Sequence, residues 1–145
     1  MSVDINCLGV LLATISSMFV GGIWYDNKAG FGKPWRTMLG VPLDVKMTPA
    51  MKKSLNMSLL KAFITAGFMA YVLAHVAFLS HSFYNNSFLM DSMTTAFWVW
   101  AGFQATRMIM RDAFEGRRKK LTLINTGNDF VTIMLMGLII GLVGH

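Results

Sequence analysis

Charged residues are scarce in this chain of 145 residues, because Asp, Glu, Lys and Arg together make up only 14% of it. Soluble domains of this size carry roughly a quarter charged residues, whereas 54% of this chain is hydrophobic. These proportions exclude an ordinary cytosolic domain, and the length fits one compact unit. The single cysteine, Cys7, excludes a disulfide framework and a metal site built from cysteines alone.

Residues 1–27 also lack lysine and arginine. A secretory signal peptide would begin with basic residues and end at a small-residue cleavage site. The twenty-one residues from Ile5 to Tyr25 carry no charge, and a helix of roughly 20 residues can cross the hydrocarbon layer. We therefore expect this segment to be retained as a membrane helix.

Three further segments have the length and composition of membrane helices. The predicted helices are 5–25, 49–79, 88–110 and 121–143, all within a single membrane domain, 1–145. Thr48 followed by Pro49 is typical of a helix start. The fold class expected is an all-α, integral membrane four-helix bundle with an interfacial loop at 26–48. The aromatic anchors expected at the membrane surface are Trp24 and Tyr25, just before this loop, and Trp35 within it.

The thirteen lysines and arginines predict the orientation of the bundle. Residues 26–61 hold seven of them and residues 107–120 hold the other six. By the positive-inside rule, both basic loops face the cytoplasm and both termini lie on the outer side. The chain is therefore expected to be a multi-pass membrane protein. Because topology explains the basic residues, we do not expect nucleic-acid binding.

Polar residues recur at spacings of three and four on the last two predicted helices, so they fall on one face of each helix. The predicted intramembrane polar site comprises Gln104, Arg107, Asn125, Asn128, Asp129 and Thr132. An ionised Asp within the hydrocarbon costs roughly 3 kcal/mol on insertion scales. Two interpretations stay open: Asp129 pairs with Arg107 or accepts hydrogen bonds from Gln104 and Asn125, or the site lines a wet path for protons or cations.

Small residues recur every fourth position on three predicted helices. Such rows let helix backbones approach closely where lipid supplies no hydrophobic drive. The packing residues expected are Ala13, Ser17 and Gly21, then Ala66, Ala70 and Ala74, and finally Gly137 and Gly141.

Groups that would support catalysis or metal binding are sparse. His75 and His81 are six residues apart and therefore off one helical face. A nucleophile needs a base within hydrogen-bond reach, and no spacing supplies one for Cys7. We expect no catalytic residue, no metal and no cofactor.

Several short motifs resemble one bacterial family. They are Trp24-Tyr25 followed by Phe31-Gly32-Lys33-Pro34-Trp35, then Phe114-Glu115-Gly116-Arg117, and Ile124-Asn125-Thr126-Gly127 with Met136-Gly137. With these motifs the chain resembles the small membrane proteins of domain of unknown function 1761 over nearly its whole length. The resemblance implies four membrane helices and no particular activity. With the charge pattern, it places the chain in the bacterial inner membrane as a multi-pass protein. The chain differs from the family pattern in having Asp26-Asn27 after the Trp-Tyr pair and Asn128-Asp129 after the glycine.

Two functions are compatible with these features. The polar intramembrane stripe favours an oligomeric channel or transporter, whereas the interfacial loop and small-residue rows favour a non-catalytic accessory or structural subunit of other membrane proteins. The expected partners are the lipid bilayer and either further copies of the chain or another membrane protein.

Overall fold

The computed structural model describes residues 5–43 and 47–143, and within these ranges the chain is helical, without a strand. Its elements in chain order are α1 (Cys7–Trp24), α2 (Gly32–Met38), α3 (Pro49–Tyr84), α4 (Phe88–Val99), the π-helix η1 (Trp100–Ala105), α5 (Thr106–Phe114) and α6 (Lys119–Val143). The all-α prediction is therefore confirmed.

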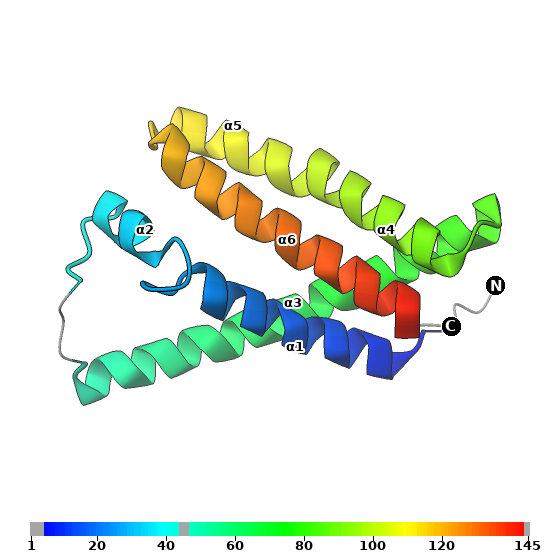
Figure 1. Ribbon diagram of the computed structural model, residues 1–145, viewed down its shortest axis with the longest axis horizontal. Helices are drawn as coiled ribbons and strands as arrows, with labels where there is room; N and C mark the ends of the chain where they lie inside the picture. The colour runs from blue at the N-terminus through cyan, green and yellow to red at the C-terminus, as the bar shows by residue number, and fades with distance from the viewer. Residues whose placement is uncertain (1–4, 44–46, 144–145) are drawn as a thin grey trace.

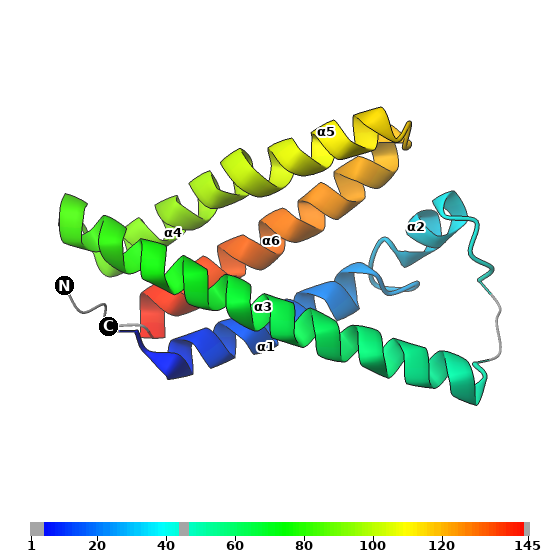
Figure 2. The ribbon, with the colours of Figure 1, turned by 180° about the vertical axis from the view of Figure 1, so that it is seen from behind.

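Each long helix packs mainly against two others, so that they form a ring, and α3 also makes a smaller contact with α6. Figure 1 shows these helices from the side. α6 packs between α1 and α4, while α3 closes the ring by packing against the same two helices. α1 begins and α6 ends at one end of the molecule, where Asn6 Nδ2 donates to the Val143 carbonyl at 2.7 Å. We call this the outer end, after the orientation that the sequence predicts, and we call the opposite one, where α6 begins, the basic end. Seen from behind, α1 and α3 diverge from α5 and α6 towards the basic end (Figure 2).

α3 is longer than the sequence predicts, because it has 36 residues and continues to Tyr84. The Thr48 side chain accepts a hydrogen bond from the Met51 amide at its start, and Asn85 ends it with a φ of 54°. At about 1.5 Å per residue the helix is about 54 Å long, which exceeds a hydrocarbon core of roughly 30 Å. Residues 47–65, at the basic end, are all exposed.

The predicted helix 88–110 is present as three consecutive segments, α4, η1 and α5, which together reach Phe114. A π-helix closes its hydrogen bonds from i to i+5 and holds an additional residue in its turn. One additional residue rotates everything that follows by about 100° relative to a continuous α-helix. The sequence gives no local signal for this change, and its consequence for Arg107 is described below.

Three helices, α1, α3 and α6, are long and apolar enough to cross a membrane. Large apolar side chains on the outside of the ring are exposed, including Phe68 at 71% and Phe103 at 75%. Such a surface suits hydrocarbon and not water. The chain is thus built as a membrane protein.

The core lies in the outer half of the ring, where small and branched residues bring the helices together. It is formed by Ala13, Ala70, Leu73, Ala74, Ala77, Phe88, Ala96, Ile133, Met136 and Ile140. At Gly137 a Cβ atom would lie 2.7 Å from the Ala96 Cβ, and at Gly141 it would lie 2.8 Å from the Leu89 Cα. These two glycines lie where α6 approaches the α4 backbone.

Replacing Gly137 by Leu should therefore push α4 away from α6. Overpacking of this kind costs about 1–3 kcal/mol of the free energy of unfolding. The measurement is SDS-induced unfolding of the purified protein in mixed micelles, followed by circular dichroism. Gly22→Leu is the control, because no atom lies within 4 Å of a Cβ at Gly22. Equal stability of the two variants would contradict the close approach.

Candidate functional site

The segment after α1 is a tight turn held by Asp26. Its Oδ1 atom accepts hydrogen bonds from the Lys28 and Ala29 amides, both at 2.7 Å, and these bonds hold the pKa of the exposed Asp26 carboxyl below its ordinary value. The Phe31 amide donates to the Trp24 carbonyl at 2.7 Å. The chain therefore reverses direction directly after α1.

Gly32 begins α2 in close contact with the end of α1. A Cβ at this position would overlap the Tyr25 carbonyl oxygen, and the residue is buried. Only glycine permits this approach. The result is that α2 lies beside the end of α1, with the Tyr25 and Trp35 rings 5.0 Å apart between centroids.

Four aromatic side chains donate hydrogen bonds to one turn of α6. We call Trp24, Tyr25, Trp35 and Trp100 the aromatic clamp. Trp24 Nε1 donates to the Ile124 carbonyl at 3.0 Å, and Trp100 Nε1 donates to the Thr126 carbonyl at 3.2 Å.

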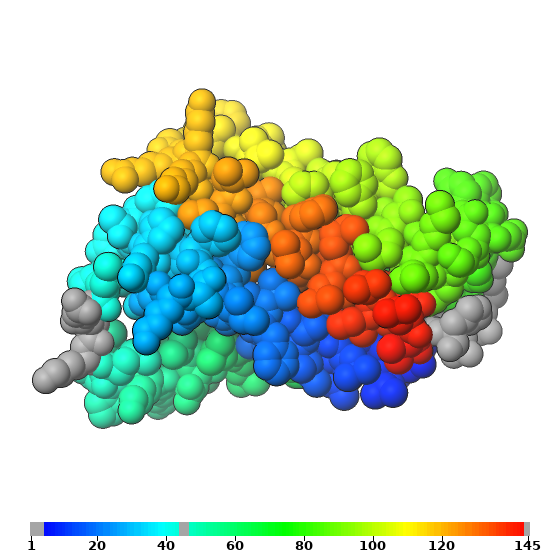
Figure 3. Space-filling view, in the orientation of Figure 1, coloured from blue at the N-terminus to red at the C-terminus, as the bar shows by residue number. Residues whose placement is uncertain are grey.

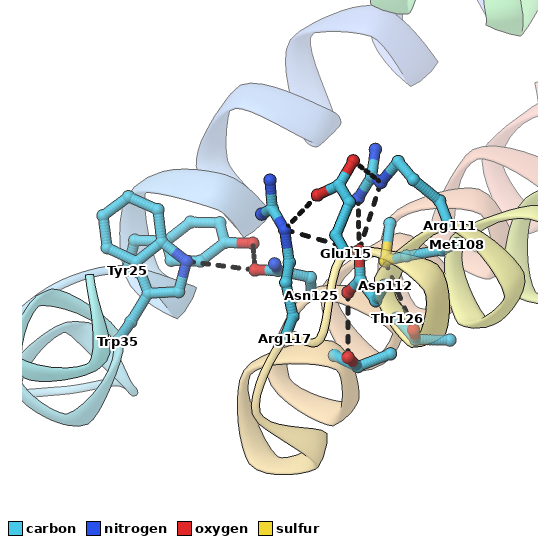
Figure 4. Close-up of polar contacts among 10 residues, drawn as sticks. Tyr25, Trp35, Met108, Arg111, Asp112, Glu115, Arg117, Asn125 and Thr126 are labelled. Carbon is cyan, nitrogen blue, oxygen red and sulfur yellow. Dashed lines mark hydrogen bonds and ion pairs between the residues drawn. The ribbon is translucent and has the colours of Figure 1, made fainter.

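The other two members share one acceptor. Tyr25 Oη and Trp35 Nε1 both donate to Asn125 Oδ1, each at 3.0 Å (Figure 4). At Gly127 a Cβ would lie 3.1 Å from the Trp24 ring, so the glycine leaves room for that indole. The sequence predicted Trp24, Tyr25 and Trp35 as anchors at the membrane surface, and the structure places their polar atoms against α6.

A pocket of about 910 Å³ lies in the basic half of the ring, between α1, α3 and α6. Its wall is mostly apolar, and its lining residues are Ser17, Met18, Gly21, Gly22, Tyr25, Trp35, Leu55, Ser58, Leu59, Ala62, Thr65, Ala66, Met69, Gln104, Asn128, Asp129 and Thr132. Among these residues Asp129 alone carries a charge. On the face shown in Figure 3, the blue and cyan atoms of the end of α1 and of α2 lie between α6 and the first half of α3.

The pocket brings together four of the six residues of the predicted polar site. Gln104, Asn128, Asp129 and Thr132 line it. Asn125 lies one turn nearer the basic end and is occupied by the aromatic clamp. Gln104 and Asp129 thus line the same pocket, although no hydrogen bond joins them.

The predicted pair between Asp129 and Arg107 is absent. Arg107 is exposed, and no ion pair or hydrogen bond involves Asp129 within the described ranges. Gln104 Nε2 donates to the Met69 sulfur at 3.1 Å instead of to the carboxylate. The physical reason is η1, because the additional residue in its turn rotates Arg107 away from the face that a continuous α-helix would give it.

The partly buried Asp129 is therefore not satisfied by this protein's own side chains. Beside it, the Asn128 Nδ2 atom is buried and has no hydrogen-bond partner within the described ranges. Buried polar groups normally have partners. The pocket consequently offers one carboxylate acceptor and one amide donor to whatever occupies it.

The small-residue rows divide between the core and the pocket. Ala13, Ala70 and Ala74 belong to the buried core, whereas Ser17, Gly21 and Ala66 line the pocket. The rows of α1 and α3 are thus packing faces near the outer end and cavity walls nearer the basic end, whereas Gly137 and Gly141 both pack against α4. The spacing alone does not distinguish the two roles.

A second cluster holds the α5–α6 turn at the basic end. The buried Asp112 accepts from Arg111 Nη2 at 2.9 Å through Oδ1 and from Thr122 Oγ1 at 2.8 Å through Oδ2, while Arg117 Nε lies 3.8 Å from Oδ1 (Figure 4). Arg117 also pairs with Glu115 at 2.6 Å. Burial opposes ionisation, but the Thr122 and Arg111 hydrogen bonds and the two guanidinium charges outweigh it, so the pKa of Asp112 lies below its ordinary value.

The sequence did not indicate that Asp112 is buried, since it lies in a strongly basic segment that resembles a solvated loop. Trp100 lies four residues before Gln104, so helical spacing indicates that it shares the face of Gln104 and points to its contact with α6. The sequence signal for this turn is Gly116, because glycine commonly ends a helix. In the structure its φ is 65°, and the Arg117 amide donates to the Asp112 carbonyl at 2.9 Å. Among the described residues no group of three or more His, Cys, Asp or Glu side chains gathers as a metal site would require.

Replacing Asn125 by Ala should loosen α2, because Tyr25 and Trp35 would both lose their acceptor. The measurement is hydrogen–deuterium exchange of the α2 amides, which should become at least about threefold faster, given roughly 0.6 kcal/mol or more per lost hydrogen bond. Asn128→Ala is the control on the same helix, since Asn128 accepts nothing from α2. Unchanged α2 exchange in the Asn125 variant would contradict the clamp.

Replacing Asp112 by Asn should lower the free energy of unfolding by about 1–3 kcal/mol at neutral pH, as expected for hydrogen bonds to a charged group. The folded-state pKa of Asp112 lies below its ordinary value of 3.8, so the ionised form stabilises the fold. This stabilisation is complete above the ordinary pKa and is lost as the pH falls through the lowered one.

The difference between wild type and the Asp112 variant should therefore shrink below about pH 4. Unfolding titrations at several pH values in micelles measure it. Glu115→Gln is the control, since that side chain is 44% exposed. A difference that is constant from neutral to acid pH would show that the Asp112 charge does not stabilise the turn.

Comparison with known proteins identifies the family. A family model described as "Protein of unknown function (DUF1761)" matches residues 8–141. Neither the curated proteins nor the solved structures compared with the chain gave a match. The match covers nearly the whole chain and includes every motif on which the resemblance rests. The chain belongs to the DUF1761 family of proteins of unknown function.

Proposed function

We propose that this chain is a small transporter of the bacterial inner membrane, with the pocket around Asp129 as its binding site. In this proposal the segment from α4 through α5 is a fourth membrane crossing, the basic end faces the cytoplasm, and both termini lie outside. Two observations support this topology. The beginning of α1 and the end of α6 lie at one end of the molecule, and Arg111, Arg117 and the start of α6 lie at the other.

The observation that carries the proposal is the state of Asp129. It lines a mostly apolar pocket without a hydrogen bond or ion pair from the described residues. A charged group in such surroundings is costly unless it binds a proton, a cation or water. Intramembrane carboxylates of this kind commonly mark ion and substrate pathways.

The packing of the outer half favours a transporter over an open channel. Core residues such as Leu73, Ile133 and Met136, each at most 2% exposed, fill the ring between the pocket and the outer end. A permanently open path would have to pass through them. Alternating exposure of the pocket to the two sides needs only that the helices separate at the other end.

An oligomer is part of the proposal, because one chain leaves the α3 wall of its pocket exposed along residues 47–65. The same exposed segment supports the alternative, a non-catalytic accessory subunit that binds a larger membrane protein. In neither case do we assign a catalytic step. Gentle extraction of the tagged chain separates the two, since a fixed multiple of 16.1 kDa favours self-assembly and a fixed ratio to another protein favours the accessory role.

We propose that Asp129 binds and releases a transported proton, so replacing Asp129 by Asn should abolish proton movement through the protein. The measurement is the dissipation of an imposed pH gradient in proteoliposomes that contain a pH-sensitive dye. Wild-type protein should dissipate the gradient several-fold faster than protein-free liposomes. The variant should match the protein-free rate, because the Asn amide does not bind and release a proton near neutral pH.

Glu115→Gln is the control, because it removes a carboxylate from the basic end outside the pocket. It should keep the wild-type rate. A wild-type rate no faster than that of empty liposomes, or an Asp129 variant as fast as wild type, would overturn the transporter proposal.

A further inference from the structure

The chemistry of the pocket wall also indicates which class of ligand it accepts. Its volume of about 910 Å³ lies within the range of small-molecule sites. Its surface is mostly apolar, with Leu55, Leu59 and Ala62 of α3 opposite the polar residues of α6. A ligand that fills it must therefore be largely apolar.

The aromatic residues at the basic end of the pocket offer ring carbon and not donors. Tyr25 and Trp35 both line the pocket, but their hydroxyl and indole hydrogens are already used on Asn125. The two rings lie 5.0 Å apart and are tilted by 56°. Aromatic rings whose polar hydrogens are already bonded still present their faces, and these faces attract organic cations through the ring quadrupole.

The charge of the pocket selects a cation. Asp129 carries the single formal charge among the lining residues, and no lysine or arginine of the described chain lines the pocket. An anionic ligand would meet this carboxylate, while Arg111, whose charge acts on Asp129, lies outside the pocket and is paired with Asp112. A neutral ligand would leave that carboxylate without a partner, which is costly in an apolar site.

A metal ion fits less well than an organic cation. Calcium takes six to eight oxygen ligands and magnesium needs near-octahedral oxygen coordination, whereas here one carboxylate stands among apolar walls. Zinc is held by three or four side-chain ligands, and Asp129 has no companion of that kind in the pocket.

We infer that the pocket binds a lipophilic organic monocation, with its charge beside Asp129 and its apolar body between α1, α3 and the Tyr25–Trp35 pair. This inference rests on the proposed function and specifies the substrate class of the same site. Thr132 and Gln104 lie around the carboxylate as neutral polar groups, which suits a delocalised or fully substituted cation.

The experiment compares two probes of the same shape and opposite charge, tetraphenylphosphonium and tetraphenylborate. Radiolabelled probe is equilibrated by dialysis with the full-length protein in phosphatidylcholine nanodiscs, and empty nanodiscs give the background. The phosphonium should bind saturably at about one per chain, while the borate should show background only. Equal binding of the two ions, or no saturable phosphonium binding, would overturn the inference.

Two variants locate the binding. Asp129→Asn should weaken phosphonium binding at least about tenfold. Gly21→Leu should weaken it without a change in charge, because a Cβ at Gly21 meets nothing within 4 Å and the leucine extends into the pocket. Gly102→Leu is the matched control, since Gly102 also has nothing within 4 Å but lies outside the pocket.

The thermal unfolding midpoint of each variant is measured first, without probe. A variant that is unfolded is set aside, and the folded variant decides the result. Wild-type affinity retained in both folded pocket variants would overturn the assignment. Proton flux is measured on the same preparations. Flux without phosphonium binding rejects the ligand class and leaves the transporter intact, whereas phosphonium binding without flux supports the ligand class and rejects the transporter.

Discussion

The hydrogen bonds from the aromatic clamp to one turn of α6 determine how the basic half of the ring is built. In a membrane, lipid tails are as apolar as leucine, so helices are held together by close packing and by hydrogen bonds between them. The outer half is held by close packing, with Gly137 and Gly141 against α4. The basic half is held by hydrogen bonds between helices, and the aromatic rings that donate these bonds also separate the helices. The pocket lies in the basic half, beside the Tyr25 and Trp35 rings.

The π-helix η1 contributes to both the clamp and the pocket. Trp100, its first residue, donates to the Thr126 carbonyl, and Gln104 reaches the pocket four residues later. After the π turn Arg107 faces outward. Because Arg107 faces outward, it does not pair with Asp129, which is the one charged residue among the described residues that line the pocket. π-bulges are frequent at functional sites. Here the π-helix directs Trp100 and Gln104 inward and Arg107 outward.

Much of the architecture could be predicted from the sequence, because length and lack of charge are direct consequences of a hydrocarbon solvent. The proximity of Gln104 and Asp129 also followed from helical spacing on two neighbouring helices. The failures have physical causes. Helical wheels assume a uniform α-helix, so Arg107 was assigned to the wrong face. Small residues permit both close packing and empty space, so the position of Gly21 in the pocket wall could not be read from its spacing.

The environments of three aspartates in the helical ring explain why one of them differs in role. Asp91, at the outer end, accepts from Asn86 at 3.0 Å and faces His81 at 3.1 Å. Asp112, at the basic end, is held by Thr122 and two arginines. Both carboxylates are almost fully buried and satisfied within the chain, as buried charges in a stable fold must be. Asp129 lies between them and has no hydrogen bond or ion pair from the described residues, although the charge of Arg111 acts on its carboxylate. A carboxylate in an apolar wall is costly unless it binds a proton, water or a ligand. This difference from Asp91 and Asp112 supports the proposed binding site.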